Sequence, residues 1–283
     1  MAIKTFRPVT HSLRHTRLVD FVELTESKPL KKLTSGKNKS GGRNNRGRQT
    51  VAGRGGGHKR RLRDIDFNRT TKDGVPARVH SIEYDPNRSS FIAQIWYKDG
   101  TKSYILAPQG LEIGKEVMSG PQAEPRIGNC LPLASIPQGL AVHSVELQPG
   151  KGAQVARAAG SQCIVAGRDG DWINVQLPSG EVRKFHPQCR ASIGQLSNLD
   201  HMNQNYGKAG RRRWLGLKPK NRGVSKNPVD HPHGGGNDRG TEGGTPSDRH
   251  GNFSKGPKTR NPRKPSNTMI VRSRRGQSAS QSA

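Results

Sequence analysis

The sequence predicts a mainly β protein in which two small barrels stand in tandem between long, basic, irregular N- and C-terminal arms. Positive charge lies at the two ends of the chain, and the apolar residues are concentrated in its middle. The middle also shows short alternating apolar and polar runs and no long amphipathic helix. We expect an arm over residues 1–63, barrels over 64–125 and 126–200, and a C-terminal extension over 201–283.

The charge is divided sharply along the chain. Residues 1–63 carry 17 Lys and Arg against 3 Asp and Glu, and residues 207–283 carry 18 against 4, while residues 64–206 carry 14 of each sign. Each arm therefore has a net charge of +14 and the middle has none. Cationic arms neutralise phosphates and release condensed counterions, which favours a polyanionic partner. The alternative, a solubilising charge run, fits less well because both arms are rich in Gly and Arg and nearly free of acids.

The composition limits the core and the cellular setting. Only 29% of the residues are hydrophobic, so the arms cannot bury enough apolar surface to offset their ordering entropy, and we expect them to fold on a partner. No apolar run approaches the ~20 residues that span a bilayer, and no signal-peptide segment is visible. We therefore expect no membrane partner. Cys130, Cys163 and Cys189 form no C-x-x-C pair and are predicted to be buried thiols.

The first barrel is predicted from strand signals that follow one another closely. Along 91–97, Phe91, Ala93, Ile95 and Tyr97 share one face, and Asp99-Gly100 marks a hairpin turn after them. The expected strands are Val79–Tyr84, Phe91–Tyr97, Ser103–Leu106 and Leu111–Val117.

The second barrel is predicted from a similar group after the Pro, Gly and Asn cluster at 119–132. Ile173, Val175 and Leu177 alternate with polar residues, which is the period of a half-buried strand. With so many short strands, a five-stranded barrel of the oligonucleotide-binding kind is one candidate fold. The expected strands are Ala141–Leu147, Cys163–Ala166, Trp172–Leu177 and Glu181–Phe185.

Glycine and cations alternate in both arms, which favours contact with nucleic acid. We expect residues 28–63 to form an extended arm in which glycines let the backbone approach phosphates and Arg supplies charge and stacking planes; a flexible linker is the alternative. Trp214 either stacks on a base or anchors the arm. The RNA-binding candidates in the arms are Arg43, Arg46, Arg48, Arg54, His58, Lys59, Arg60, Arg61, Lys208, Arg211, Arg212, Arg213, Trp214, Lys258, Arg260, Arg272 and Arg274.

The segment Asn227–Gly236 holds the sharpest local motif, Asp-His-Pro-His-Gly-Gly-Gly. An esterase oxyanion loop would need a downstream G-x-S-x-G elbow, and none follows. A metal site on His231, His233 and Asp230 lacks further ligands, and acid–base catalysis lacks a nucleophile. We therefore expect no catalytic residue and no protein-held metal. A proline-stiffened loop that meets RNA closely fits better, and its candidate contacts are Asp230, His231, His233, Gly234, Gly235 and Gly236.

Motifs along almost the whole chain resemble the universal large-subunit ribosomal proteins of the L2 family in their bacterial form. The sequence departs from the family pattern at Lys226 and Asn237, where the family has Met and Glu, and at Ser247-Asp248, where it has Trp-Gly. The missing Trp bears on how residues 238–258 dock. The motifs are Ser40–Asn44, Gly55–Lys59, Tyr84–Ser89, Tyr97–Gly100, Tyr104–Pro108, Pro149–Gly152, Gly207–Gly210 and Asn227–Gly236.

The resemblance implies an oligonucleotide-binding barrel followed by an SH3-like barrel. It implies a non-enzymatic ribosomal protein of translation that binds large-subunit rRNA and supports subunit association, tRNA binding and the peptidyl transferase region. The implied partners are this rRNA, other ribosomal proteins and the small subunit at the inter-subunit face. No cofactor is expected, although the rRNA could bring structural Mg²⁺ ions. The expected location is the cytoplasmic ribosome, with the plastid stroma as the alternative.

Two other classes of protein remain as alternatives. A free RNA-modifying or RNA-cleaving enzyme would need a cleft with paired catalytic groups, and none is visible in the sequence. A DNA-packaging protein fits the charge, but packaging does not require the two-barrel pattern.

Overall fold

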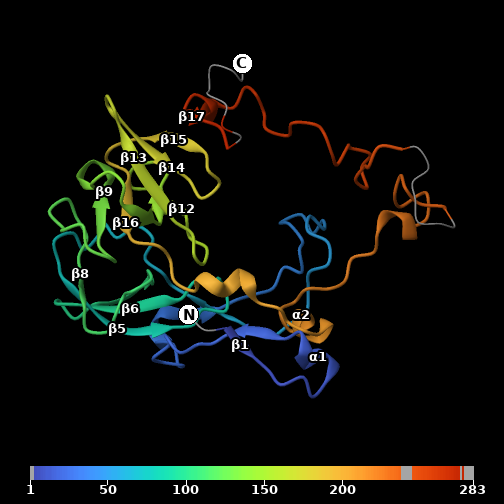
Figure 1. The fold of residues 1–283 in the computed structure, drawn as a ribbon, viewed down its shortest axis with the longest axis horizontal. Coiled ribbons are helices and arrows are strands. Elements are labelled where there is room, and N and C mark those ends of the chain that lie inside the picture. Colours follow the sequence, from blue (N-terminus) through green and yellow to red (C-terminus); the bar gives the residue numbers. More distant parts are fainter. Residues whose placement is uncertain (1–2, 237–243, 275, 277–283) are drawn as a thin grey trace. The chain divides into compact units, whose positions relative to one another are not determined.

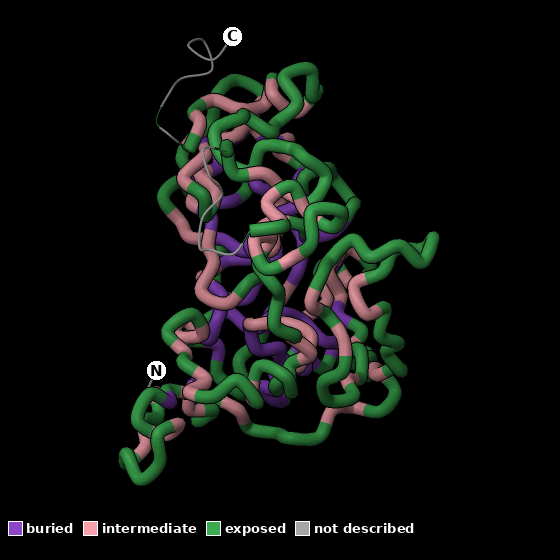
Figure 2. The backbone as a smooth tube through the Cα atoms, turned by 90° about the vertical axis from the view of Figure 1, so that its right-hand side faces the viewer, coloured by how far each residue is buried: buried purple, intermediate pink, exposed green. Residues whose placement is uncertain are grey.

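The structure is a computed structural model and describes residues 3–236, 244–274 and 276. The chain forms two compact units. The first comprises Met1–Lys37, Lys59–Lys208 and Thr268–Ala283, and the second comprises Asn38–His58 and Ala209–Asn267. Every buried residue that the structure describes, purple in Figure 2, belongs to the first unit, so the hydrophobic cores lie there.

The first unit contains a curved antiparallel sheet built from the first group of predicted strands. Its order is β7-β6-β5-β8, and β5 and β6 lie side by side in Figure 1. Phe91, Ala93, Ile95 and Tyr97 are all buried in one apolar cluster, which confirms their predicted common face. The hairpin at Asp99-Gly100 is also confirmed, because Gly100 has φ 82° and Asp99 Oδ1 accepts the Thr101 N–H. The strands are β5 Ala77–Glu83, β6 Ile92–Tyr97, β7 Lys102–Leu106 and β8 Glu116–Val117.

The N-terminal segment is more attached to this sheet than the sequence suggested. Leu30 and Leu33 pack against a second buried cluster that contains Tyr104, and the Leu30 N–H donates to Tyr104 Oη at 2.9 Å. Both ends of the extended arm expected over 28–63 are therefore attached to the first unit. A few apolar residues in a polar run are enough to cover part of the outer face of the sheet. The elements here are β1 Ile3–Thr5, α1 His11–Arg14, β2 Arg17–Val19, a 3₁₀ helix Lys31–Leu33, β3 Thr34–Gly36 and β4 Arg61–Arg63, with β1 paired to β2 and β3 to β4.

A second antiparallel sheet in the first unit contains the second group of predicted strands. Its order is β17-β15-β14-β13-β10-β16-β9. The edge strand β17 comes from the C-terminal extension and pairs Arg272 with Val182. The strands are β9 Cys130–Pro132, β10 Ala141–His143, β13 Cys163–Asp169, β14 Trp172–Gln176, β15 Val182–Phe185, β16 Arg190–Ile193 and β17 Ile270–Arg272, with 3₁₀ helices at Leu133–Ser135 and Leu199–Asn203.

The strand expected over 141–147 is in fact two strands. Ser144 has φ 53°, a left-handed conformation that a continuous strand does not contain. The chain therefore leaves β10 there and enters β11 Val145–Glu146, which pairs with β12 Ala153–Val155 in a separate two-stranded sheet. Of 111–117, only β8 is a strand.

The mainly β fold class is confirmed. The first unit contains two β bodies, one around each antiparallel sheet, which are consistent with an oligonucleotide-binding barrel followed by an SH3-like barrel. The predicted buried thiols are confirmed as well, since Cys130, Cys163 and Cys189 are buried and free. The domain limits at 63, 125 and 200 stay predictions. No helix in the described part of the chain is long and apolar enough to cross a membrane.

The second unit is formed from irregular backbone and no described residue in it is buried. Its regular elements are α2 Ala209–Trp214 and 3₁₀ helices at Gly223–Ser225 and Pro265–Asn267.

Candidate nucleic-acid interface

Two basic segments from opposite ends of the chain are joined by backbone hydrogen bonds in the second unit. The Gly55 N–H donates to Gly216 O at 3.1 Å, the His58 N–H to Trp214 O at 2.9 Å and the Lys218 N–H to Gly53 O at 2.9 Å. The cations of the N-terminal arm and those around α2 therefore form one surface.

Gly57 shows why this junction needs glycine. Its φ is +77°, and a Cβ there would lie 2.6 Å from Gly216 N and 2.8 Å from Trp214 O. Both neighbours are backbone atoms, which cannot swing aside as a flexible side chain can. A larger residue would thus force the two basic segments apart.

The junction carries a cationic, aromatic surface. One groove is lined by Arg54, Arg212, Arg213, Lys218 and Lys220 among others. A neighbouring hollow is lined by residues 55–58, Arg213, Trp214 and Lys218, and Trp214 is 61% exposed. The structure thus brings together the predicted residues Arg54, His58, Arg212, Arg213 and Trp214.

Sequence reasoning missed Lys218 and Lys220 in this groove. The signal that could have identified them is the basic run around Pro219, directly after α2.

The loop that carries Arg43, Arg46 and Arg48 is organised by Asn44. Asn44 Oδ1 accepts the N–H groups of Arg46 and Arg48, each at 3.0 Å, so the backbone curls around the amide. These three arginines have no carboxylate within 4.0 Å among the residues described. Their charges therefore remain available to an external anion.

The Asn227–Gly236 loop is a series of tight turns. The Gly234 N–H donates to His231 O at 2.9 Å and the Gly235 N–H to Lys226 O at 3.1 Å. A Cβ on Gly234 would lie 2.4 Å from Asn227 O, and Gly235 has φ +89° with Pro228 Cγ only 2.5 Å from such a Cβ. Both glycines are required by the loop itself.

The two loop histidines accept hydrogen bonds from backbone N–H groups and so stabilise the loop. His231 Nδ1 accepts the His233 N–H at 3.1 Å, and His233 Nε2 accepts the Ser247 N–H at 3.1 Å. Their rings meet edge to face with centroids 5.0 Å apart. Ser247 stands where the family pattern has Trp, so here a backbone amide links the loop to the following segment. Asp230 is exposed, and Asn237 lies outside the described residues.

In the first unit, two arginines that sequence reasoning missed lie against one aromatic ring. The guanidinium carbons of Arg88 and Arg157 lie 5.5 and 5.0 Å from the ring centroid of Phe67, within cation–π range. Arg88 also pairs with Asp85 at 2.6 Å. The signal available in the sequence was the Asp85–Arg88 turn.

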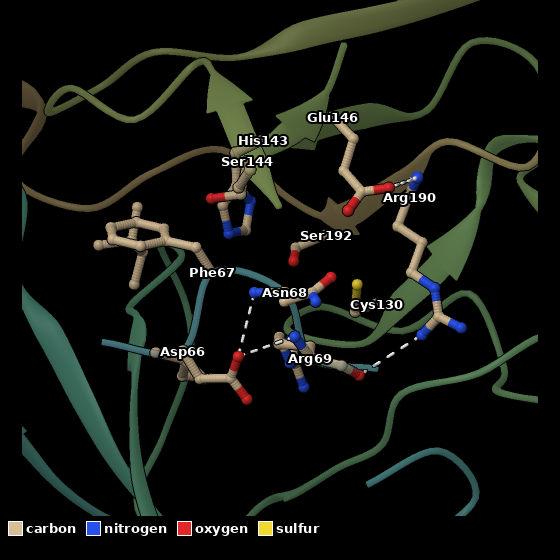
Figure 3. A pocket seen from close by; sticks show the side chains of 13 residues that line it. Asp66, Phe67, Asn68, Arg69, Cys130, His143, Ser144, Glu146, Arg190 and Ser192 are labelled. Carbon is tan, nitrogen blue, oxygen red and sulfur yellow. Dashed lines mark hydrogen bonds between the residues drawn. The ribbon is translucent and has the colours of Figure 1, made fainter. Parts of the chain in front are cut away.

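A cavity of about 20 Å³ lies in the first unit and is drawn in Figure 3. Its carboxylate is already engaged, since Glu146 accepts the N–H groups of Gly152 at 2.9 Å and Arg190 at 3.0 Å. His143 Nδ1 lies 2.8 Å from Gly194 O, and burial lowers the pKa of His143 to about 4. Burial raises the pKa of the Cys130 thiol, so this thiol is a poor nucleophile. The cavity has room for about one water molecule and none for a substrate.

Comparison with known proteins agrees with these features. A family model described as "Ribosomal Proteins L2, RNA binding N-terminal domain" matches residues 30–119, and "Ribosomal Proteins L2, C-terminal domain" matches residues 126–254. The large ribosomal subunit protein uL2 of Methylorubrum populi is 54% identical over 274 residues, which cover 97% of this chain and 98% of that protein. The chain belongs to the ribosomal protein L2 family. The resemblance to this family in its bacterial form is thereby confirmed.

The remaining predicted contacts of this L2-family protein lie in two places. Lys59, Arg60 and Lys208 belong to the first unit, as do Arg61 on β4, Arg272 on β17 and Arg274. Arg211 on α2, Lys258 and Arg260 belong to the second unit, where Arg260 Nε donates to Asn267 Oδ1 at 2.6 Å. Contact of any of these residues with RNA stays a prediction. In the described part of the chain, no three His, Cys, Asp or Glu side chains gather as a metal site would require.

Proposed function

We propose that this protein, a structural constituent of the large ribosomal subunit, binds large-subunit rRNA chiefly through the Arg-rich junction of residues 38–58 with 209–220. The observation that carries the proposal is the backbone pairing of two basic segments around Gly57, where a Cβ would collide with the opposite backbone. It supports a single cationic surface on which phosphates bind and Trp214 stacks on a base.

The proposal assigns the protein no turnover of its own. The imidazoles of His231 and His233 are used as acceptors for backbone N–H groups, which supports a structural role for the loop. Cofactors are not part of the proposal, and Mg²⁺ would enter with the RNA. A free RNA-cleaving or RNA-modifying enzyme is not favoured by any described site.

The proposal extends to the setting in which the protein works. Through its family it would contact other ribosomal proteins and the small subunit at the inter-subunit face. It would also support subunit association, tRNA binding and the region of the peptidyl transferase centre. The cytoplasmic ribosome is the proposed location.

The test is the salt dependence of rRNA binding. We compare the full chain with a variant in which Arg43, Arg46 and Arg48 are all changed to Gln, and with a control that carries Lys115→Gln on the first body. Each lost phosphate contact should reduce the slope of log affinity against log salt by about 0.7–0.9. An unchanged slope in the triple variant would count against the proposal.

A further inference from the structure

The outer face of the first sheet carries an exposed stack of three side chains. The rings of His80 and Trp96 are parallel within 10°, with centroids 3.9 Å apart, and Lys102 Nζ lies 3.8 Å from the indole centroid. Two groups this close to one ring centre must occupy opposite faces of the indole. Trp96 is nevertheless 38% exposed, and His80 and Lys102 are exposed as well. The stack therefore presents the free face of the imidazole and the edge of the indole to the outside.

A β-bulge and the strand register position the stack. The pairing of β5 with β6 shifts between Val79 and Ser81, which leaves His80 as the extra residue, and a bulge re-aims the side chain that it carries. Trp96 is directly opposite Lys102 in the pairing of β6 with β7. The neighbours Ile95 and Tyr97 point into the core, so the indole must point outward.

A polar chain inside the sheet face fixes the edge of the indole. In the orientation of Gln94 that satisfies both ends of its amide, Oε1 accepts the Trp96 Nε1–H at 3.1 Å and the nitrogen donates to Glu83 at 3.3 Å. Glu83 in turn accepts Tyr104 Oη–H at 2.8 Å. The aromatic surface is thus rigid before any partner arrives, which lowers the entropic cost of binding.

The charge around the stack favours an anionic partner. Lys102 has no carboxylate within 4.0 Å in the parts of the chain that are described, and the nearby Asp99 is already paired with Lys72. Of the other acids on this sheet, Glu116 of β8 is opposite Arg78 of β5 in the strand register, and Glu83 accepts the Tyr104 hydroxyl. A flat aromatic surface beside an unneutralised ammonium is the combination that single-stranded nucleic acid uses.

We propose that His80, Trp96 and Lys102 form a second RNA contact, in which an unpaired nucleobase stacks on the imidazole and Lys102 neutralises an adjacent phosphate. This inference rests on the proposed rRNA binding but adds a different surface on a different unit. The contact lies on three adjacent strands, with His80 on β5, Trp96 on β6 and Lys102 on β7. The base, the imidazole and the indole would then form one continuous stack of aromatic rings.

The experiment measures binding of the full-length chain to a large-subunit rRNA transcript over a range of salt concentrations. Base–aromatic stacking predicts that His80→Ala weakens binding roughly 5- to 150-fold with an unchanged salt slope. His80→Phe keeps a ring over Trp96 and should bind nearly as the parent does. Lys102→Gln should reduce the slope by about 0.7, the value for one phosphate contact in a single strand, and Lys115→Gln should leave it unchanged.

The outcomes are distinguishable. Parental affinity of a folded His80→Ala chain, checked by its urea midpoint, would overturn the inference. If His80→Ala fails to fold, an unchanged salt slope in Lys102→Gln overturns it instead. Normal rRNA affinity combined with poor incorporation into subunits would indicate a protein contact and would also overturn it. If the stack variants bind normally while the Arg43, Arg46 and Arg48 variant loses salt dependence, the proposed function stands without this contact.

Discussion

Arg190 donates two parallel hydrogen bonds to Asp73, from Nη1 to Oδ1 at 2.6 Å and from Nη2 to Oδ2 at 2.5 Å. Asp73 lies in the turn before β5 and Arg190 begins β16, so one ion pair ties the two β bodies of the first unit together. The geometry is bidentate, and the Arg190 side chain is only 16% exposed. These two features distinguish the pair from an ordinary surface ion pair.

Arg190→Ala should lower the free energy of unfolding by about 1–2 kcal/mol, because it removes a charge-assisted pair that is partly shielded from water. Urea unfolding of the free chain measures this. The matched control, Lys115→Ala, breaks the exposed pair with Glu112 and should cost less than about 0.5 kcal/mol. Equal losses in the two variants would show that the pair between the bodies is not special.

The buried His143 should make the first unit sensitive to acid. Its pKa is lowered from 6.5 to about 4 by burial, so between these values the unfolded chain binds a proton that the folded chain does not. Stability is therefore full above pH 6.5 and should fall, by up to about 1.4 kcal/mol per pH unit, as the pH decreases toward 4. His143→Asn keeps a donor for Gly194 O and should have a flatter profile. Parallel profiles from urea midpoints at pH 7 and pH 5 would contradict this assignment.

Gly235→Val should impair assembly or subunit function severely, because it combines φ +89° with a Cβ 2.5 Å from Pro228 Cγ. Gly244→Val is the control, since nothing lies within 4 Å of a Cβ there and Gly244 is not a candidate RNA contact. His231→Gln and His233→Gln should be milder. The measurement is peptidyl transfer by purified large subunits, normalised to occupancy. A His variant at full occupancy whose chemistry falls by several orders of magnitude would support a catalytic role instead.

Hydrogen exchange on the free chain should separate a protected body from weakly protected arms. Amides in Phe91–Tyr97 lie in a buried sheet, whereas no described residue of 38–58 is buried. We therefore expect slow exchange in the first segment and fast exchange in the second. The Leu30 amide, bonded to Tyr104 Oη, should be slower than the amides of Arg43–Arg48. Strong protection throughout 38–58 would show that the arm folds without RNA.

Some of these features could be predicted from local pattern. Alternation of apolar residues at 91–97 and 173–177 is a property of neighbouring residues, and it indicated the correct buried faces of β6 and β14. The two basic arms, the turn at Asp99-Gly100 and the buried cysteines are likewise local or compositional. The order and spacing of the short motifs along almost the whole chain indicated the family.

Other features depend on contacts between residues that are distant in the sequence. The break at Ser144 and the pairing of β17 with β15 leave no signal in the local sequence. The short strands β9, β12 and β16 show too little alternation to be recognised, because their partners stabilise them. The contact of Leu30 with Tyr104 and the backbone pairing of residues 53–58 with 214–218 also join residues that are distant in the sequence. The stack of His80, Trp96 and Lys102 needs a bulge in one strand and the register of another. The sequence alone therefore determined the residue chemistry and the local faces, while the tertiary structure decided which of these faces meet, since hydrogen bonds and packing across the chain select the register.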